Sequence, residues 1–227
     1  MASFDLDLII RIFVSPNSAF LQIRDNEEKY FAQAIALLII SSAIGGLAVL
    51  PFVMMPLDDA YFEFEGSEDI ENTFPLNDSA IGLSVASGIL SGFVSAILYY
   101  FIGKSLDGNT NWKKVFAVYF HVYAIVIPIT IIMAILIFLM WDSFTSIEPS
   151  ILLDSNINEE DVFSLLGSFI GYVILLAILG IGFAIWVLIL TIKAIKTVHG
   201  FGTGKSFGLI ILVAIITSLV GIPFSFV

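Results

Sequence analysis

The sequence has no cysteine and few charged residues. Without cysteine, the chain can form no disulfide, thiolate nucleophile or cysteine-bound metal site. Charged residues make up 13% of its 227 residues, against roughly 25% in soluble globular domains. Hydrophobic residues make up 59%. This composition excludes a water-soluble domain and predicts an integral membrane protein.

Catalytic and nucleic-acid-binding patterns are also missing. The chain has two histidines, no HExxH motif and no carboxylate pair at membrane depth, so we expect no enzyme, no cofactor and no metal site. Its net charge of −11 argues against binding to nucleic acid. The opening residues, MASFDLD, lack the positive n-region of a signal peptide, so we expect no cleaved leader.

Five hydrophobic runs are long enough to cross a bilayer as helices, which takes about 20 residues. The fold class is therefore all-α, a bundle of five transmembrane helices that together form a membrane domain over residues 30–227. The predicted spans cover residues 31–55, 80–103, 115–141, 162–191 and 206–226.

Residues 1–29 precede the first span and show helical periodicity. Apolar residues recur at Phe4, Leu8 and Ile12, and Ser15-Pro16 is typical of a new helix start. Two interpretations stay open for this segment. It forms two amphipathic helices on the cytoplasmic membrane surface, or it is a helical leader that packs against the bundle.

The charges divide sharply between the two sides of the predicted bundle. All nine Lys and Arg residues lie in the N-terminal segment and in the turns after the second and fourth spans. Loops 56–79 and 142–161 hold fourteen acidic residues and no basic residue. Because basic loops stay in the cytoplasm, we predict a multi-pass protein of the cell membrane with a cytoplasmic N-terminus and an external C-terminus.

Small residues mark the faces on which membrane helices pack closely. We predict that these faces form the bundle interior, although they could instead mediate formation of a homo-oligomer. The second and fourth spans carry the clearest stripes, at Ser84, Gly88, Gly92, Ala96, Gly167 and Gly171.

The third span contains a candidate intramembrane polar site, made of His121, Tyr123 and Pro128. An ionisable residue inside a membrane is a functional candidate, so His121 is either a pH-sensitive or ligand-binding group, or a structural histidine bonded to a backbone carbonyl. Proline inside a helix removes a hydrogen bond and tends to kink it, and a kink at Pro128 would open a cavity or shape the packing.

Basic residues in the two predicted cytoplasmic turns are candidate contacts for lipids or a protein partner. The segment GFGTGKS over residues 200–206 ends like a P-loop, but the motif requires glycine where the chain has His199. The turn either holds a lipid phosphate beside its lysine or is a simple flexible connection. The candidate contacts are Lys113, Lys114, Lys193, Lys196 and Lys205.

The layout resembles the Yip-domain family of Ypt/Rab-interacting membrane proteins, particularly its archaeal and bacterial branch. Residues 12–24, IFVSPNSAFLQIR, are similar to the opening pattern F-x-S-P-x-x-A-F-x-x-I/L-R of that branch. Five hydrophobic spans follow. The turn GNTNWKKVFAV over residues 108–118 enters a span with Tyr123 and Pro128, and the last turn is Gly-rich and basic.

The resemblance implies a five-helix membrane protein with a cytoplasmic N-terminus. Eukaryotic members are tied to vesicle traffic and small GTPases, and they carry a D-L-Y-G-P-type motif that this chain lacks. We therefore predict a non-enzymatic scaffold that organises the membrane or binds lipids and a cytoplasmic partner. Two alternatives remain: a passive small-molecule permease or channel, and a lipid-binding or lipid-transfer protein.

Overall fold

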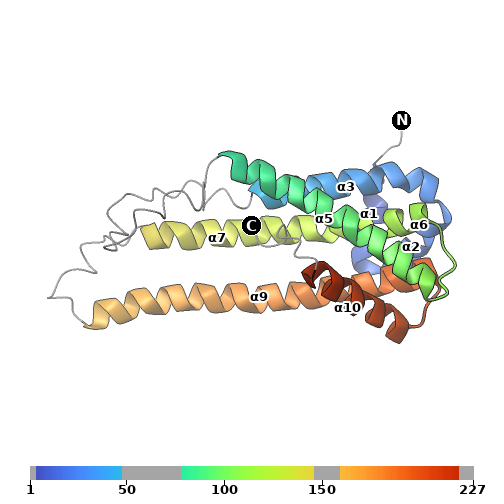
Figure 1. Ribbon diagram of the computed structural model, residues 1–227. Coiled ribbons are helices and arrows are strands. Elements are labelled where there is room, and N and C mark those ends of the chain that lie inside the picture. Colours follow the sequence, from blue (N-terminus) through green and yellow to red (C-terminus); the bar gives the residue numbers. More distant parts are fainter. Residues whose placement is uncertain (1–3, 48–77, 146–158, 220–227) are drawn as a thin grey trace, which may run out of the picture.

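The computed structural model describes residues 4–47, 78–145 and 159–219. Within these ranges the chain is helical, with no strand. Figure 1 shows the helices running roughly along one axis. Their bounds are Leu6–Val14 (α1), Pro16–Asp25 (α2), Glu27–Leu47 (α3), Asp78–Ser105 (α5), Trp112–Phe120 (α6), Tyr123–Thr145 (α7), Glu159–His199 (α9) and Thr203–Leu219 (α10).

The structure confirms an all-α polytopic membrane fold. Within the described residues, four segments are long and apolar enough to cross a bilayer, namely Glu27–Leu47, Ile81–Ser105, Trp112–Leu139 and Ile170–His199. The predicted fifth span corresponds to a shorter apolar helix, Thr203–Ser218. The far ends of the first and fifth predicted spans, residues 48–55 and 220–226, lie outside the described residues.

The third predicted span is interrupted between α6 and α7. Helix α7 runs on through Pro128, and the interruption lies earlier, at His121 and Val122. There the backbone N–H groups of Ala124 and Ile125 donate three residues back instead of four, to His121 and Val122 at 3.2 and 3.0 Å. The helix is therefore interrupted at His121, which the sequence analysis selected as a polar residue, and not at Pro128.

Helices α1 and α2 form an antiparallel hairpin that turns at Ser15. Ser15 precedes Pro16, whose fixed φ suits the first helical position. The side chains that face the bundle are fully buried, so the hairpin packs against the bundle, and its position at the membrane surface stays a prediction. These buried residues are Leu8, Ile12, Ala19, Phe20 and Ile23.

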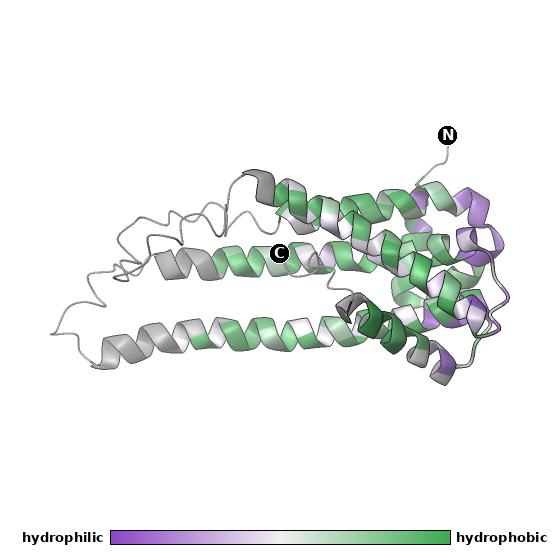
Figure 2. Ribbon diagram, in the orientation of Figure 1, coloured by the Kyte–Doolittle hydropathy of each residue, from purple (hydrophilic) through white to green (hydrophobic). Residues whose placement is uncertain are grey.

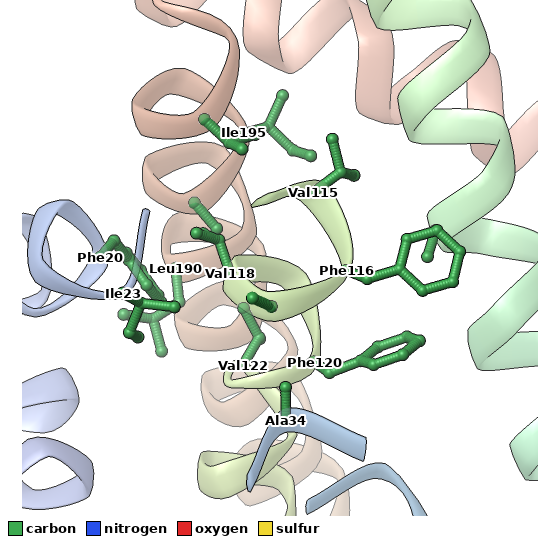
Figure 3. Close-up of a cluster of buried hydrophobic side chains, with 14 of the residues drawn as sticks. Phe20, Ile23, Ala34, Val115, Phe116, Val118, Phe120, Val122, Leu190 and Ile195 are labelled. Carbon is green, nitrogen blue, oxygen red and sulfur yellow. The ribbon is translucent and has the colours of Figure 1, made fainter. Parts of the chain in front are cut away.

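The hairpin is held to the bundle at both of its ends. The Asp5 N–H donates to Gln33 of α3 at 3.2 Å, and Arg24 donates to the Thr197 carbonyl of α9 at 3.2 Å. Figure 3 shows Phe20 and Ile23 beside Leu190 of α9. Both ends of the hairpin therefore lie near the same end of the bundle, and its turn points into the apolar layer.

The hydrophobic core is concentrated at one end of the molecule. That end holds the start of α3, the turn between α5 and α6, and the turn between α9 and α10, and Figure 2 shows the hydrophilic residues collected there. We call it the basic end, because the lysines at the start of α3 and α6, at the end of α5 and α9 and at the start of α10 all lie there (Figure 1). Away from the basic end, few residues of α9 are buried. In the most apolar 18-residue stretch of α9 only 6% of the residues are buried, against 39% in that of α3.

Candidate functional site

Candidate lysines from three helices meet at the basic end. Lys113 and Lys114 belong to the first turn of α6, where the Asn111 side chain caps the helix by accepting from the Lys114 N–H at 2.8 Å. Asn111 also donates to Glu27 of α3 at 3.3 Å. The Lys113 ammonium lies 3.8 Å from Glu28, and both side chains are exposed. The cap thus fixes the two lysines beside the start of α3.

The other three lysines surround the turn between α9 and α10. Gly200 adopts a positive φ of 73° and ends α9, and its N–H donates to the Lys196 carbonyl at 2.9 Å. Lys205 lies 3.9 Å from Asp107 and 4.7 Å from the centre of the Phe201 ring. Lys193 and Lys196 make no ion pair within the described residues, so their charges are free for an external anion.

A polar network under the hairpin was not predicted from the sequence. The Tyr30 hydroxyl donates to the Asp5 carboxylate at 3.2 Å and accepts from Gln22 at 2.7 Å and from Lys29 at 3.1 Å. Asp5 also caps α1 by accepting from the Leu8 N–H at 3.0 Å. That hydrogen bond, joined by Tyr30 and the Lys29 charge, holds the pKa of Asp5 below its ordinary value against partial burial.

The predicted intramembrane polar site is not one site. His121 is fully buried. Its Nδ1–H donates to the Ala117 carbonyl at 2.6 Å, and its ring meets the Tyr30 ring at a right angle with centroids 6.1 Å apart. Tyr123 instead packs against Tyr119, with ring centroids 5.8 Å apart. The bond to Ala117 is the one expected of a structural histidine, although Nε2 is buried without a hydrogen-bond partner.

The residues around Pro128 do line a cavity, which lies between α7 and α9. Its volume is about 530 Å³, and every residue that lines it is apolar. Phe13 of α1 forms part of the wall, so the N-terminal hairpin contributes to it. The lining residues are Phe13, Ile125, Ile129, Ile178, Leu179, Gly182, Phe183 and Trp186.

Comparison with known proteins places this arrangement in a family. The family described as the Yip1 domain matches residues 10–224, nearly the whole chain. The chain belongs to the Yip1 domain family. No curated protein and no solved structure matches it. The matched range begins inside α1, so the hairpin is part of the Yip1 domain as well as of its hydrophobic core.

The small-residue stripe of α5 lies against α3 in this Yip1 domain. A Cβ atom added at Gly88 would lie 3.0 Å from the Ser42 Oγ, and one added at Gly92 would lie 2.5 Å from a Leu38 methyl group. Ala96 is fully buried, and Ser84 is half-buried. These residues therefore set how closely the two helices approach.

The stripe of α9 has no such partner among the described residues. Gly167 and Gly171 are exposed there, and a Cβ atom added at either meets nothing within 4 Å. Both interpretations of this stripe, an internal face of the bundle and a contact with a second copy, stay predictions.

A histidine that the sequence gave no reason to select joins the two basic turns of the Yip1 domain. His199 is 3% exposed and stacks on Phe201 at 5.0 Å between ring centres. Its ring occupies the space that side chains at Gly103 and Gly108 would need. The Tyr99 backbone interacts with the ring, but neither ring nitrogen has a hydrogen-bond partner of standard geometry among the described residues.

Proposed function

We propose that this Yip1-domain protein is a non-enzymatic membrane scaffold whose basic end binds anionic lipid headgroups and a protein partner at the cytoplasmic leaflet. One observation carries the proposal. Helices α6, α9 and α10 bring five lysines to the same end of the bundle, and those lysines are Lys113, Lys114, Lys193, Lys196 and Lys205.

The carboxylates at this end leave the lysines largely available. Lys113 and Lys205 each have one carboxylate at 3.8 and 3.9 Å, and Glu28 and Asp107 are 85% and 98% exposed. Exposed pairs of this kind contribute about 0–1 kcal/mol. A lysine near an anionic membrane surface contributes about 1 kcal/mol, so headgroups compete well for these charges.

The charge distribution also gives the proposed orientation. All nine basic residues lie in the N-terminal segment and in the turns after the second and fourth predicted spans, and translocation of basic segments is disfavoured. We therefore place the basic end and the N-terminus in the cytoplasm, and the C-terminus outside the cell membrane.

Lipid retention tests the proposed function. The protein is purified in mild detergent from membranes containing equal amounts of phosphatidylglycerol and phosphatidylcholine, and the retained lipids are counted by native mass spectrometry. We expect the wild type to retain phosphatidylglycerol preferentially, and a variant with all five lysines changed to Gln to lose that preference. The matched control changes the same five lysines to Arg and keeps it. Equal retention of the two lipids by the wild type would refute the proposal.

The permease alternative gains no support from the cavity between α7 and α9. A pathway for a polar solute needs polar groups along its lining, whereas this cavity is lined by apolar residues. The same feature favours a hydrocarbon occupant.

A further inference from the structure

The cavity between α7 and α9 has the form of a lipid-facing groove. Both helices contain segments long and apolar enough to span a bilayer, so hydrocarbon surrounds the groove. Its volume of about 530 Å³ falls within the roughly 300–1,000 Å³ of ordinary small-molecule sites. Its walls come from three elements: Phe13 of α1, Ile125 and Ile129 of α7, and Gly182, Phe183 and Trp186 of α9.

Gly182 gives the groove its depth. A Cβ atom added at this position meets no other atom within 4 Å, so the space in front of the glycine is open. Trp186 lies one turn further along α9, is 38% exposed and lines the same groove. A flexible apolar chain fits this surface, because the lining consists of aliphatic and aromatic side chains and one glycine.

A cation lies on the same face of α9, nearer to the basic end. Gly182, Trp186 and Lys193 are separated by four and seven residues, and such positions share one helix face. The rise of an α-helix places Lys193 about 16 Å along the axis from Gly182. Lys193 is half-buried and has no ion pair among the residues that the structure describes. This separation is short enough for one lipid molecule to place an anionic group at Lys193 and an apolar chain at Gly182.

We propose that the groove between α7 and α9 binds one acyl chain of an anionic phospholipid whose phosphate pairs with Lys193. This inference rests on the proposed function, since it assumes that the basic end faces anionic headgroups. It adds a defined site to that general surface. Phe13 makes the N-terminal hairpin part of the site, so lipid binding and hairpin packing support each other.

Fluorescence of Trp186 tests the proposal directly. A variant with Trp112 and Trp141 changed to Phe leaves Trp186 as the reporter. It is reconstituted into vesicles of phosphatidylcholine and phosphatidylglycerol in equal amounts, with dibrominated acyl chains on one lipid or on the other. Bulk lipid quenches the exposed ring in both cases. A bound anionic lipid adds quenching only when phosphatidylglycerol is brominated, and we expect about a fivefold preference for it at the groove, as one lysine near the surface provides.

Two test variants, Gly182→Leu and Lys193→Gln, and one control in this background decide the outcome. Gly182→Leu fills the groove and leaves every lysine in place, and we expect it to make the two brominated lipids quench equally. Gly180→Leu is the matched control, because an added Cβ there also meets open space but Gly180 does not line the groove. It should keep the preference. Lys193→Gln should abolish it.

The result that overturns the groove differs from the result that overturns the scaffold. Equal quenching in the parent variant, or an undiminished preference in Gly182→Leu or in Lys193→Gln, would overturn the groove. The count of retained phosphatidylglycerol by mass spectrometry reports on all five lysines and is measured independently. A groove that fails while that count stays high leaves the proposed function standing.

Discussion

The contact between Gly103 and His199 yields a quantitative prediction for the variant Gly103→Ala. Gly103 lies in the last turn of α5, and an added Cβ atom would come within 2.6 Å of Nε2 and 2.7 Å of Nδ1 of the His199 ring. The ring is 3% exposed and stacked on Phe201, so it has little room to move. The methyl group must therefore displace a packed side chain or the turn that covers it.

The magnitude follows from two opposing effects. Alanine in place of glycine within a helix stabilises by about 1 kcal/mol, and overpacking a buried contact costs about 1–3 kcal/mol. We expect Gly103→Ala to lower the free energy of unfolding by up to about 2 kcal/mol. Gly82→Ala, in the same helix but with open space at its Cβ, should raise it by up to about 1 kcal/mol.

A double-mutant cycle isolates the contact. His199→Ala destabilises by itself, because it leaves a cavity, but in that background Gly103→Ala should become stabilising. The free energies of unfolding are measured by denaturant titration in detergent micelles with circular dichroism. We expect a coupling of about 2 kcal/mol, within the range for residues in contact. If the two changes add independently, or if Gly103→Ala behaves like Gly82→Ala, the packing argument is refuted.

Three further predictions use the same purified protein or intact cells. The natural absence of cysteine allows single-cysteine variants. Lys193→Cys should react with a membrane-impermeant maleimide only after permeabilisation, whereas Ser67→Cys should react in intact cells. The reverse labelling pattern would show that the proposed orientation is inverted. Asp5→Ala should cost about 1 kcal/mol, as loss of a helix cap does. Because the folded-state pKa of Asp5 is lowered, its contribution is complete above the ordinary carboxyl pKa and is lost as the pH falls through the folded value, so unfolding curves of wild type and variant should converge only in acid. Gly92→Val should lower the free energy of unfolding by about 1–3 kcal/mol through overpacking, while Gly171→Val, which faces open space, should change stability by less than about 0.5 kcal/mol.

The fold class could be predicted from the sequence because bilayer thickness and charge asymmetry act on long segments. Runs of about twenty apolar residues define spans whatever their neighbours are. In the part of the chain that the structure describes, four of the five predicted spans appear as helical segments long enough to cross. The break at His121 was not predictable in the same way. The imidazole bonds locally, to the Ala117 carbonyl four residues earlier, but it also packs against Tyr30 of α3, and that contact exists only in the folded bundle.

The candidate site was only partly predictable from the sequence, because some of its contacts form only in the folded bundle. The lysines were selected from their positions in the chain, which the charge rule interprets without any knowledge of packing. The small-residue motif gave the same signal for α5 and α9, although within the described part of the chain only the stripe on α5 meets a neighbouring helix. The Asp5–Tyr30 network and the contacts of His199 connect residues that are distant in the sequence. No local sequence pattern predicts such contacts.

Helix α9 is longer than every other helix that the structure describes. Its candidate membrane segment, Ile170–His199, carries Lys193, Lys196 and His199 in its last turns, so its uninterrupted apolar part covers residues 170–192. That part extends about 35 Å, and the hydrocarbon layer is about 30 Å thick. A modest tilt accommodates the difference, and a thicker bilayer requires less tilt. Lys193 and Lys196 would then lie at the boundary between the hydrocarbon and the headgroups.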